Sequence, residues 1–305
     1  MKASPQVEAA TARYIDSLGP AALQKAHDYT VGKEWMLLWG LLVAAIVTWL
    51  IVRSGLLDRL AQRTAERRNN LRAFLMLLAP VLFEPLFNKY EPVPPGQVRD
   101  AVVSMAQRAG IPPDKVYMFN GSRQSNNFTA NAGGVGNTAR VAISDVALKS
   151  ASLDEVRAVT GHEIGHYVLK HTWWGILIFS IIAVVLFWLA DRLFPRFARA
   201  FGTNATLSDP RGIPVLVFLV SLFGLLALPF LNTFARTIET QADLYSLQTE
   251  NRPDALASAL VKTAEYRYPR PNEVEEVLFY DHPSVERRVR MAMEWKAAHP
   301  EPPTQ

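Results

Sequence analysis

The stretch His162-Glu163-Ile164-Gly165-His166 is an H-E-x-x-H run in a segment with the apolar period of a helix. Residues four apart share one face of a helix, so both imidazoles can reach one zinc ion. Glu163 adjoins His162 and can contact a water on that ion, which is the place of a general base. The alternative is a pair of surface histidines, but with six histidines in 305 residues a chance run is a poor explanation. The run predicts a zinc peptidase.

Three long apolar runs predict an integral membrane protein. Residues 35–52 and 173–190 are 18 uncharged residues each, and residues 213–235 are 23. Each run is long enough to cross a hydrocarbon core about 30 Å thick, and a soluble protein of this size could bury one such helix but not three. The first run begins after 34 mostly polar residues, too deep for a cleavable signal peptide, so we expect it to be an anchor.

The composition narrows the kinds of metal site and partner. The chain has no cysteine, which excludes disulfides and cysteine ligands for zinc. Its net charge of +4 is modest, and its basic residues are scattered or near the ends of apolar runs. Phospholipid headgroups explain them better than nucleic acid does, so we expect the lipid bilayer as a partner and no nucleic acid.

Residues 73–87 form a fourth apolar segment, and the sequence leaves open whether it crosses the membrane. Pro80, Glu84 and Pro85 interrupt it, and its uncharged stretch of 11 residues is too short to cross alone. The preceding residues 53–72 carry six arginines and should stay cytoplasmic under the positive-inside rule. If 73–87 does not cross, the zinc site also faces the cytoplasm, and we favour this orientation.

Residues 88–172 have the composition of a soluble part with helices and strands. Ser152 and Glu155 form a capping box that starts the helix with the H-E-x-x-H run, and this helix should continue, with little or no break, into the run at 173–190. A strand expected at 139–144 could offer an edge to an extended substrate.

The predicted fold class is therefore mainly α, with polytopic membrane helices and a small α+β zincin-like catalytic domain. The expected division is a polar N-terminal segment at 1–34, a membrane span at 35–52, a basic loop and the fourth apolar segment at 53–87, the zinc-peptidase part at 88–172, a span at 173–190, a loop at 191–212, a span at 213–235 and a C-terminal part at 236–305.

A catalytic zinc usually takes three protein ligands and a water, so a third ligand is needed. Glu239 is the best candidate, because Glu239 and Asp243 lie four apart on one helical face after the last apolar run. One carboxylate can bind the metal while the other accepts a hydrogen bond from a ligand histidine. An ordinary solvated helix with an Arg236–Glu239 ion pair explains the spacing equally well.

Two further histidines are weaker candidates. On an unbroken helix, His171 lies roughly 140° round from His166, so we expect a structural or headgroup-level histidine rather than a fourth ligand. His282 precedes Pro283 at a helix start, where a lone histidine is usually a capping or surface residue.

Several motifs together resemble the integral-membrane CaaX prenyl protease (type I) family of zinc metallopeptidases, which remove -aaX from prenylated C-termini. The motifs are the H-E-x-x-H run with His171, Asn232…Arg236…Glu239…Asp243, Asp281-His282-Pro283-Ser284…Arg288, Ala79-Pro80…Leu86-Phe87-Asn88-Lys89 and Met118-Phe119-Asn120-Gly121-Ser122.

The resemblance implies roles for residues across the chain. It implies Zn²⁺, one per chain, on His162, His166 and Glu239. It implies that His282 and Asn131, in Asn131-Ala132, help to hold the scissile carbonyl and its oxyanion. Around the ligands it places Asp243, Arg236 and Arg288.

The chain also departs from this family. Members typically have seven spans around an intramembrane chamber, whereas this chain has three clear ones, with spans missing at about residues 70–71. Gly133 replaces the aromatic residue that usually follows the Asn-Ala pair. The outline also resembles the shorter heat-shock membrane proteases of the same superfamily, which degrade damaged membrane proteins.

Three functions therefore stay open: CaaX-type C-terminal processing, membrane-protein quality control, and an inactive zinc-binding membrane scaffold. The first two require a peptide or protein substrate, prenylated in the first case. Self-association, which would rebuild an enclosure, is a further option, in either a bacterial cytoplasmic membrane or an endoplasmic reticulum membrane.

Overall fold

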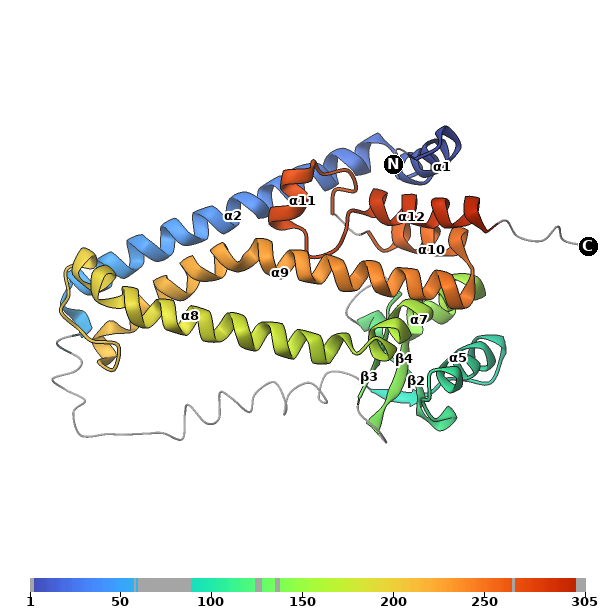
Figure 1. Ribbon diagram of the computed structural model, residues 1–305, viewed down its shortest axis with the longest axis horizontal. Helices are drawn as coiled ribbons and strands as arrows, with labels where there is room; N and C mark the ends of the chain where they lie inside the picture. Colours follow the sequence, from blue (N-terminus) through green and yellow to red (C-terminus); the bar gives the residue numbers. More distant parts are fainter. Residues whose placement is uncertain are drawn as a thin grey trace, which may run out of the picture. The chain divides into compact units, whose positions relative to one another are not determined.

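A computed structural model describes residues 3–57, 59, 89–123, 128–134, 138–264 and 267–299 (Figure 1). The apolar segment 73–87, most of the basic stretch before it and the 79–88 part of the family motif lie outside these residues. The chain divides into two compact units. One unit comprises Met1–Thr30, Val81–Thr172 and Asn232–Gln305, and the other comprises Val31–Pro80 and Trp173–Leu231.

In the part of the chain that the structure describes, three helices are long and apolar enough to cross a membrane, and they contain the three apolar runs. They are α2 (Pro20–Arg53), α8 (His171–Phe201) and α9 (Ile213–Glu250). Large apolar side chains stand exposed along them, among them Trp39 at 59%, Phe179 at 57% and Phe230 at 74%. Lipid is the environment in which such surfaces are stable, so these helices identify an integral membrane protein.

The second unit holds a small core of its own between α8 and α9. Phe194 of α8 packs against Val215 and Leu219 of α9, all nearly inaccessible to solvent. Helix α8 runs on to Phe201, so the expected loop at 191–212 is wrong for its first half. Pro195 and several arginines suggested a loop there, but the helix continues through the proline.

The described residues of the first unit form a four-stranded mixed sheet in the order β1-β2-β4-β3. Its strands are β1 (Tyr90–Pro92), β2 (Val116–Phe119), β3 (Ala130–Gly133) and β4 (Arg140–Ser144). β2 and β4 are parallel, and the two outer pairs are antiparallel. β4 is therefore an inner strand, and β3 forms the edge. The expected edge at 139–144 is wrong, because strand order depends on crossovers that a strand's own sequence does not encode.

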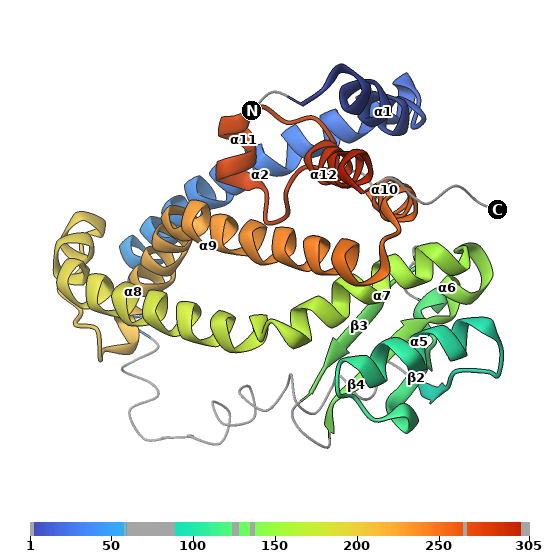
Figure 2. The ribbon, with the colours of Figure 1, turned by 45° about the vertical axis from the view of Figure 1, so that its right-hand side comes forward.

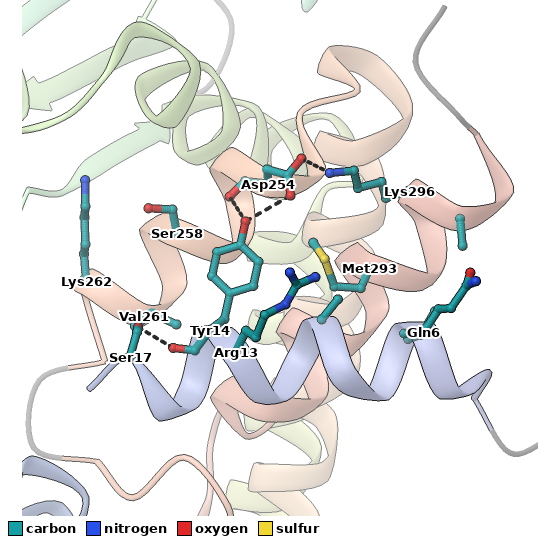
Figure 3. A pocket seen from close by; sticks show the side chains of 13 residues that line it. Gln6, Arg13, Tyr14, Ser17, Asp254, Ser258, Val261, Lys262, Met293 and Lys296 are labelled. Carbon is teal, nitrogen blue, oxygen red and sulfur yellow. Dashed lines mark hydrogen bonds and ion pairs between the residues drawn. The ribbon is translucent and has the colours of Figure 1, made fainter. Parts of the chain in front are cut away.

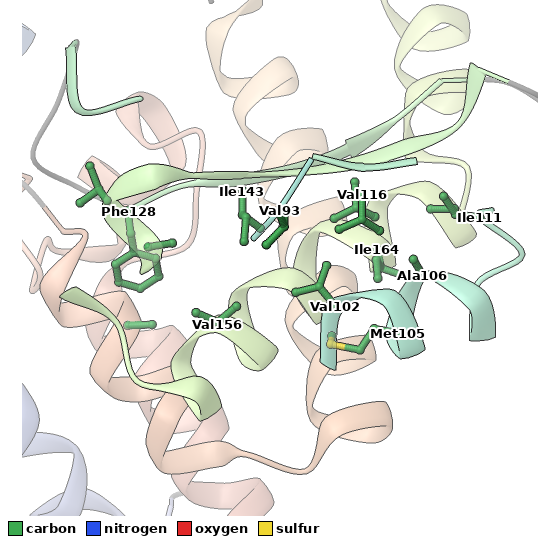
Figure 4. Close-up of a cluster of buried hydrophobic side chains, with 14 of the residues drawn as sticks. Val93, Val102, Met105, Ala106, Ile111, Val116, Phe128, Ile143, Val156 and Ile164 are labelled. Atoms are coloured by element: carbon green, nitrogen blue, oxygen red, sulfur yellow. The ribbon is translucent and has the colours of Figure 1, made fainter. Parts of the chain in front are cut away.

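Helices α5 (Gln97–Arg108) and α7 (Leu153–Val168) cover one face of this sheet, and the short helix α6 (Asp145–Ser150) follows β4 (Figure 2). The buried core lies between them, with Val102 from α5, Val156 and Ile164 from α7, and Val141 and Ile143 from β4 (Figure 4). Helix α7 begins at the capping box predicted from Ser152 and Glu155, and it packs against the sheet through Val156 and Ile164.

Four further helices are described in this unit. They are α1 (Pro5–Asp16), α10 (Pro253–Lys262), α11 (Glu273–Phe279) and α12 (Val285–Ala298). α1 packs on α10 and α12 through Val7 and Ile15, and an open groove of about 740 Å³ lies along this contact (Figure 3). In the groove the Tyr14 hydroxyl donates to Asp254 at 3.0 Å, which ties α1 to α10.

Candidate metal centre

Helices α7 and α9 bring the three predicted ligands together. One side-chain ligand atom from each of His162, His166 and Glu239 lies within 4.8 Å of the others. The two Nε2 atoms are 3.1 Å apart, and the Glu239 carboxylate lies 3.3 Å from Nε2 of His162 and 3.4 Å from Nε2 of His166. No ion pair between Arg236 and Glu239 is found among the described residues. Two imidazoles and a carboxylate that converge in this way form the donor set of a catalytic zinc site.

Two glycines allow α7 to approach α9 this closely. A Cβ atom added to Gly165 would lie 3.1 Å from Cβ of Tyr245 and 3.2 Å from Cα of Ala242. One added to Gly161 would lie 2.9 Å from Oγ of Ser246. The glycines lie four apart and flank His162 within the helix, so they face α9 together. The ligand spacing therefore depends on the absence of side chains here.

A buried carboxylate orients His162. Nδ1 of His162 is 2.8 Å from Oδ1 of Asp243, whose side chain is inaccessible to solvent. Arg288 of α12 donates to both oxygens of that carboxylate, at 2.6 and 2.7 Å, and lies 3.7 Å from Glu239. Burial disfavours a charged imidazole, but hydrogen bonds with Asp243 and Glu239 outweigh it and raise the pKa of His162 to about 10. The Glu239 carboxylate, 3.3 Å from Nε2 of His162, also offers a metal cation a ligand of opposite charge.

Arg236 donates hydrogen bonds to the segment before His282, and among the described residues no hydrogen bond joins it to the three ligands. Its guanidinium donates to the backbone carbonyls of Glu276 at 2.7 Å and Tyr280 at 2.5 Å. Asn232, one turn earlier on α9, donates to the carbonyl of Leu278 at 2.7 Å. Both residues therefore tie α9 to the end of α11, just before His282. The sequence did not predict this role, although Asn232 and Arg236 lie four apart in the motif that also contains Glu239 and Asp243.

The loop after α11 brings His282 to the ligands. Its Nε2 lies 3.5 Å from Oε1 of Glu239, and its Nδ1 lies 3.0 Å from a carboxylate oxygen of Asp281. The ring is 40% exposed, so it can meet a substrate. The helix start there is capped by Ser284 rather than by His282. His282 is therefore not the capping residue of this helix.

Asn131 lies on a strand that packs against the helix of the two histidines. It lies on the edge strand β3, exposed, opposite Ala142 of β4. Its neighbours Ala130 and Ala132 pack on the core, so the Asn131 side chain projects from the other face of the sheet. Among the described residues, no hydrogen bond joins it to the three ligands.

Glu163 lies beside the ligands on α7. It is partly buried, and this burial raises the pKa of its carboxyl group above the usual value. A raised pKa brings a carboxylate closer to the range in which it can both accept and return a proton near neutral pH. The environment of Glu163 thus suits a general base.

Comparison with known proteins points to the same chemistry. Residues 92–296 match the model of peptidase family M48. The chain is 30% identical to the uncharacterized metalloprotease YhfN of Bacillus subtilis over 225 residues, which cover 72% of this chain and 53% of that protein. It is 30% identical to a CAAX prenyl protease 1 homolog of Arabidopsis thaliana over 223 residues, which cover 71% and 52%.

A solved structure shares the fold. The crystal structure of S. mikatae Ste24p superposes with a TM-score of 0.60 at 23% identity, covering 88% of this chain and 65% of that one. The chain spans about half the length of the curated relatives it matches. The family match extends over both the H-E-x-x-H helix and Glu239. The chain therefore belongs to peptidase family M48, and its residues His162, His166 and Glu239 form a cluster that can hold a metal ion.

Proposed function

We propose that the chain is a membrane-embedded endopeptidase that holds one zinc ion on His162, His166 and Glu239. The observation that carries the proposal is the convergence of these three side chains within 4.8 Å, with Glu163 adjacent. When bound, zinc supplies Lewis acidity, which activates water and polarises a peptide carbonyl.

Glu163 is the proton carrier in this proposal. As a carboxylate it takes a proton from the attacking water, and as an acid it gives that proton to the leaving amine. The burial that raises its pKa supports both halves of this cycle.

His282 is the donor to the carbonyl oxygen as negative charge develops there. Its Nδ1 lies 3.0 Å from a carboxylate oxygen of Asp281, and its Nε2 lies on the side of Glu239. The hydrogen bond with His282 lowers the pKa of Asp281 to about 2, so the ionised Asp281 carboxylate helps to hold the ring in this orientation. Arg236 is a positioning residue, because it holds the backbone just before this loop.

An extended substrate pairs with β3 in this proposal. β3 bonds to β4 along one side and is the last strand of the described sheet. Its other side can therefore offer backbone N–H and C=O groups to a peptide, as in β-augmentation. Asn131, with its exposed side chain on this strand, is a second candidate for contact with the substrate carbonyl.

CaaX-type removal of the last three residues is the substrate class we favour. It is supported by the relatives from Arabidopsis, yeast and human, which bear the name CAAX prenyl protease 1 at 27–30% identity. Membrane-protein quality control is the second candidate, favoured by the fact that the chain spans only about half of those relatives. An inactive zinc-binding scaffold would need the ligands but not Glu163. For location we propose a bacterial cytoplasmic or endoplasmic reticulum membrane with the site facing the cytoplasm, and self-association of the chain is part of the same proposal.

Mass spectrometry of a farnesylated C-a-a-X peptide, incubated with the detergent-purified full chain, tests the substrate class. The controls are the Glu163→Gln variant, the same peptide without the farnesyl group, and an unfolded membrane protein. Loss of three residues from the farnesylated peptide alone, by wild type alone, supports CaaX processing. Cleavage of only the unfolded protein would support quality control, and no difference between wild type and Glu163→Gln would support the scaffold.

A further inference from the structure

His166 has a neutral partner on the side away from the ligands. Its Nδ1 lies 3.0 Å from Nδ1 of His171, and Nε2 of His171 lies 3.0 Å from the side-chain oxygen of Gln241 on α9. The His171 ring is buried at 4% exposure and meets His166 edge to face, with ring centroids 5.0 Å apart. Three side chains thus form a continuous line that ends at a metal ligand.

If His166 is to bind a metal, the hydrogen atoms along this line can sit on the ring nitrogens in only one arrangement. Nε2 of His166 faces the other two ligands, so it must keep a lone pair and the proton must sit on Nδ1. That Nδ1–H donates to Nδ1 of His171, which places the His171 proton on Nε2. Nε2–H in turn donates to the Gln241 carbonyl oxygen. The reverse order would put a proton on Nε2 of His166 and block the metal.

We propose that His171 and Gln241 are positioning residues that hold His166 in its metal-binding tautomer through this hydrogen-bonded line. The inference rests on the proposed zinc site and adds to it the means by which the second histidine is oriented. His162 has a charged partner in Asp243 for the same purpose. His166 instead has a neutral one, so the second ligand is oriented without a further charge near the metal.

A break between two helices places His171 where it can contact His166. α7 ends at Val168, and α8 begins at His171. Between them Lys170 adopts a left-handed backbone with φ of 58°, a conformation that is strained for a residue other than glycine. The break turns the chain so that His171 reaches the back of His166, which a continuous helix would prevent. The residue with the strained backbone therefore directly precedes His171, the middle member of the line.

Zinc affinity of the full chain in detergent, measured by competition with a chromophoric chelator, tests the proposal. His171→Phe keeps a ring of similar size but cannot accept the hydrogen bond from Nδ1–H of His166. We therefore expect zinc affinity to fall about 10- to 100-fold. Gln241→Met should weaken binding in the same direction. In Gln241→Glu the carboxylate can only accept a hydrogen bond from Nε2–H of His171, which enforces the same arrangement of hydrogens. The zinc affinity of this variant should therefore equal or exceed that of wild type. Lys170→Gly should match wild type, because glycine accepts the left-handed backbone.

Two controls separate orientation from packing and from general charge. Gln248 is exposed on α9 two turns beyond Gln241, so Gln248→Met and Gln248→Glu report the effect of the same changes away from His171. The d–d absorption of the Co²⁺-substituted protein gives a second readout, which should change in His171→Phe and stay unchanged in Gln241→Glu.

The outcomes distinguish this inference from the proposed zinc site. Wild-type affinity in His171→Phe would overturn the line while leaving the zinc site intact, as would equal losses in Gln241→Glu and Gln241→Met. If wild type itself takes up no zinc, the proposed function fails and the inference fails with it.

Discussion

The close approach of α7 to α9 predicts that a single added methyl group at Gly165 will weaken metal binding. In Gly165→Ala the new Cβ would lie 3.1 Å from Tyr245 and 3.2 Å from the backbone of Ala242, so one helix must move by a few tenths of an ångström. Overpacking of this kind costs about 1–3 kcal/mol, and alanine recovers about 1 kcal/mol of helix propensity. The net strain is about 1 kcal/mol. Because moving apart separates His162 and His166 from Glu239, we expect zinc affinity to fall about fivefold.

Chelator competition on Gly165→Ala and Gly224→Ala measures this effect with a matched control. Gly224 lies within α9, and a Cβ added there meets no atom within 4 Å among the described residues. Gly224→Ala should therefore bind zinc as wild type does. Equal affinities for both variants would refute the idea that the glycine contact sets the ligand spacing.

Three further changes have defined outcomes. His282→Ala removes a donor to the developing oxyanion, so kcat should fall about 10²- to 10³-fold while the zinc content measured by mass spectrometry stays the same. Arg236→Leu leaves buried carbonyl groups without a donor, which costs about 1–3 kcal/mol, so Tm should fall. The Glu155 carboxylate accepts hydrogen bonds from the Lys262 ammonium group at 2.6 Å and from the backbone N–H of Ser152. Burial opposes ionisation of Glu155, but these contacts outweigh it and lower the pKa of the carboxyl group. The carboxylate therefore stabilises the fold above pH 4.5, the ordinary pKa of glutamate, and this stabilisation is lost as pH falls through the lower folded pKa. The fall in Tm between neutral pH and pH 3 should therefore be smaller in Glu155→Gln than in wild type.

Local patterns predicted the parts of the molecule that one helix can encode. The helix with His162 and His166, its capping box and the three apolar helices all follow from spacing and run length. The approach of Glu239 could be suspected from its i, i+4 relation to Asp243, but its distance from the histidines depends on how α7 packs on α9. Gly161 and Gly165 carried a signal for that packing, since small residues four apart often mark a close helix contact.

Other features have no local signal. Lys170 is neither glycine nor asparagine, so nothing in the sequence indicates that its backbone is left-handed, and the position assigned to His171 on an unbroken helix was wrong. The expectation that His171 is structural rather than a ligand agrees with its contacts, but for a different reason. The order of β3 and β4 depends on chain crossovers, and the placement of Arg236 depends on carbonyl groups 40 or more residues away.

The zinc-to-protein ratio of the purified chain tests the central claim most directly. We predict close to one zinc per chain in wild type and in Glu163→Gln, because Glu163 is assigned to proton transfer rather than to the metal. In Glu239→Ala the ratio should fall sharply, because one of three ligands is removed. An unchanged ratio in Glu239→Ala, or loss of zinc in Glu163→Gln, would contradict the account.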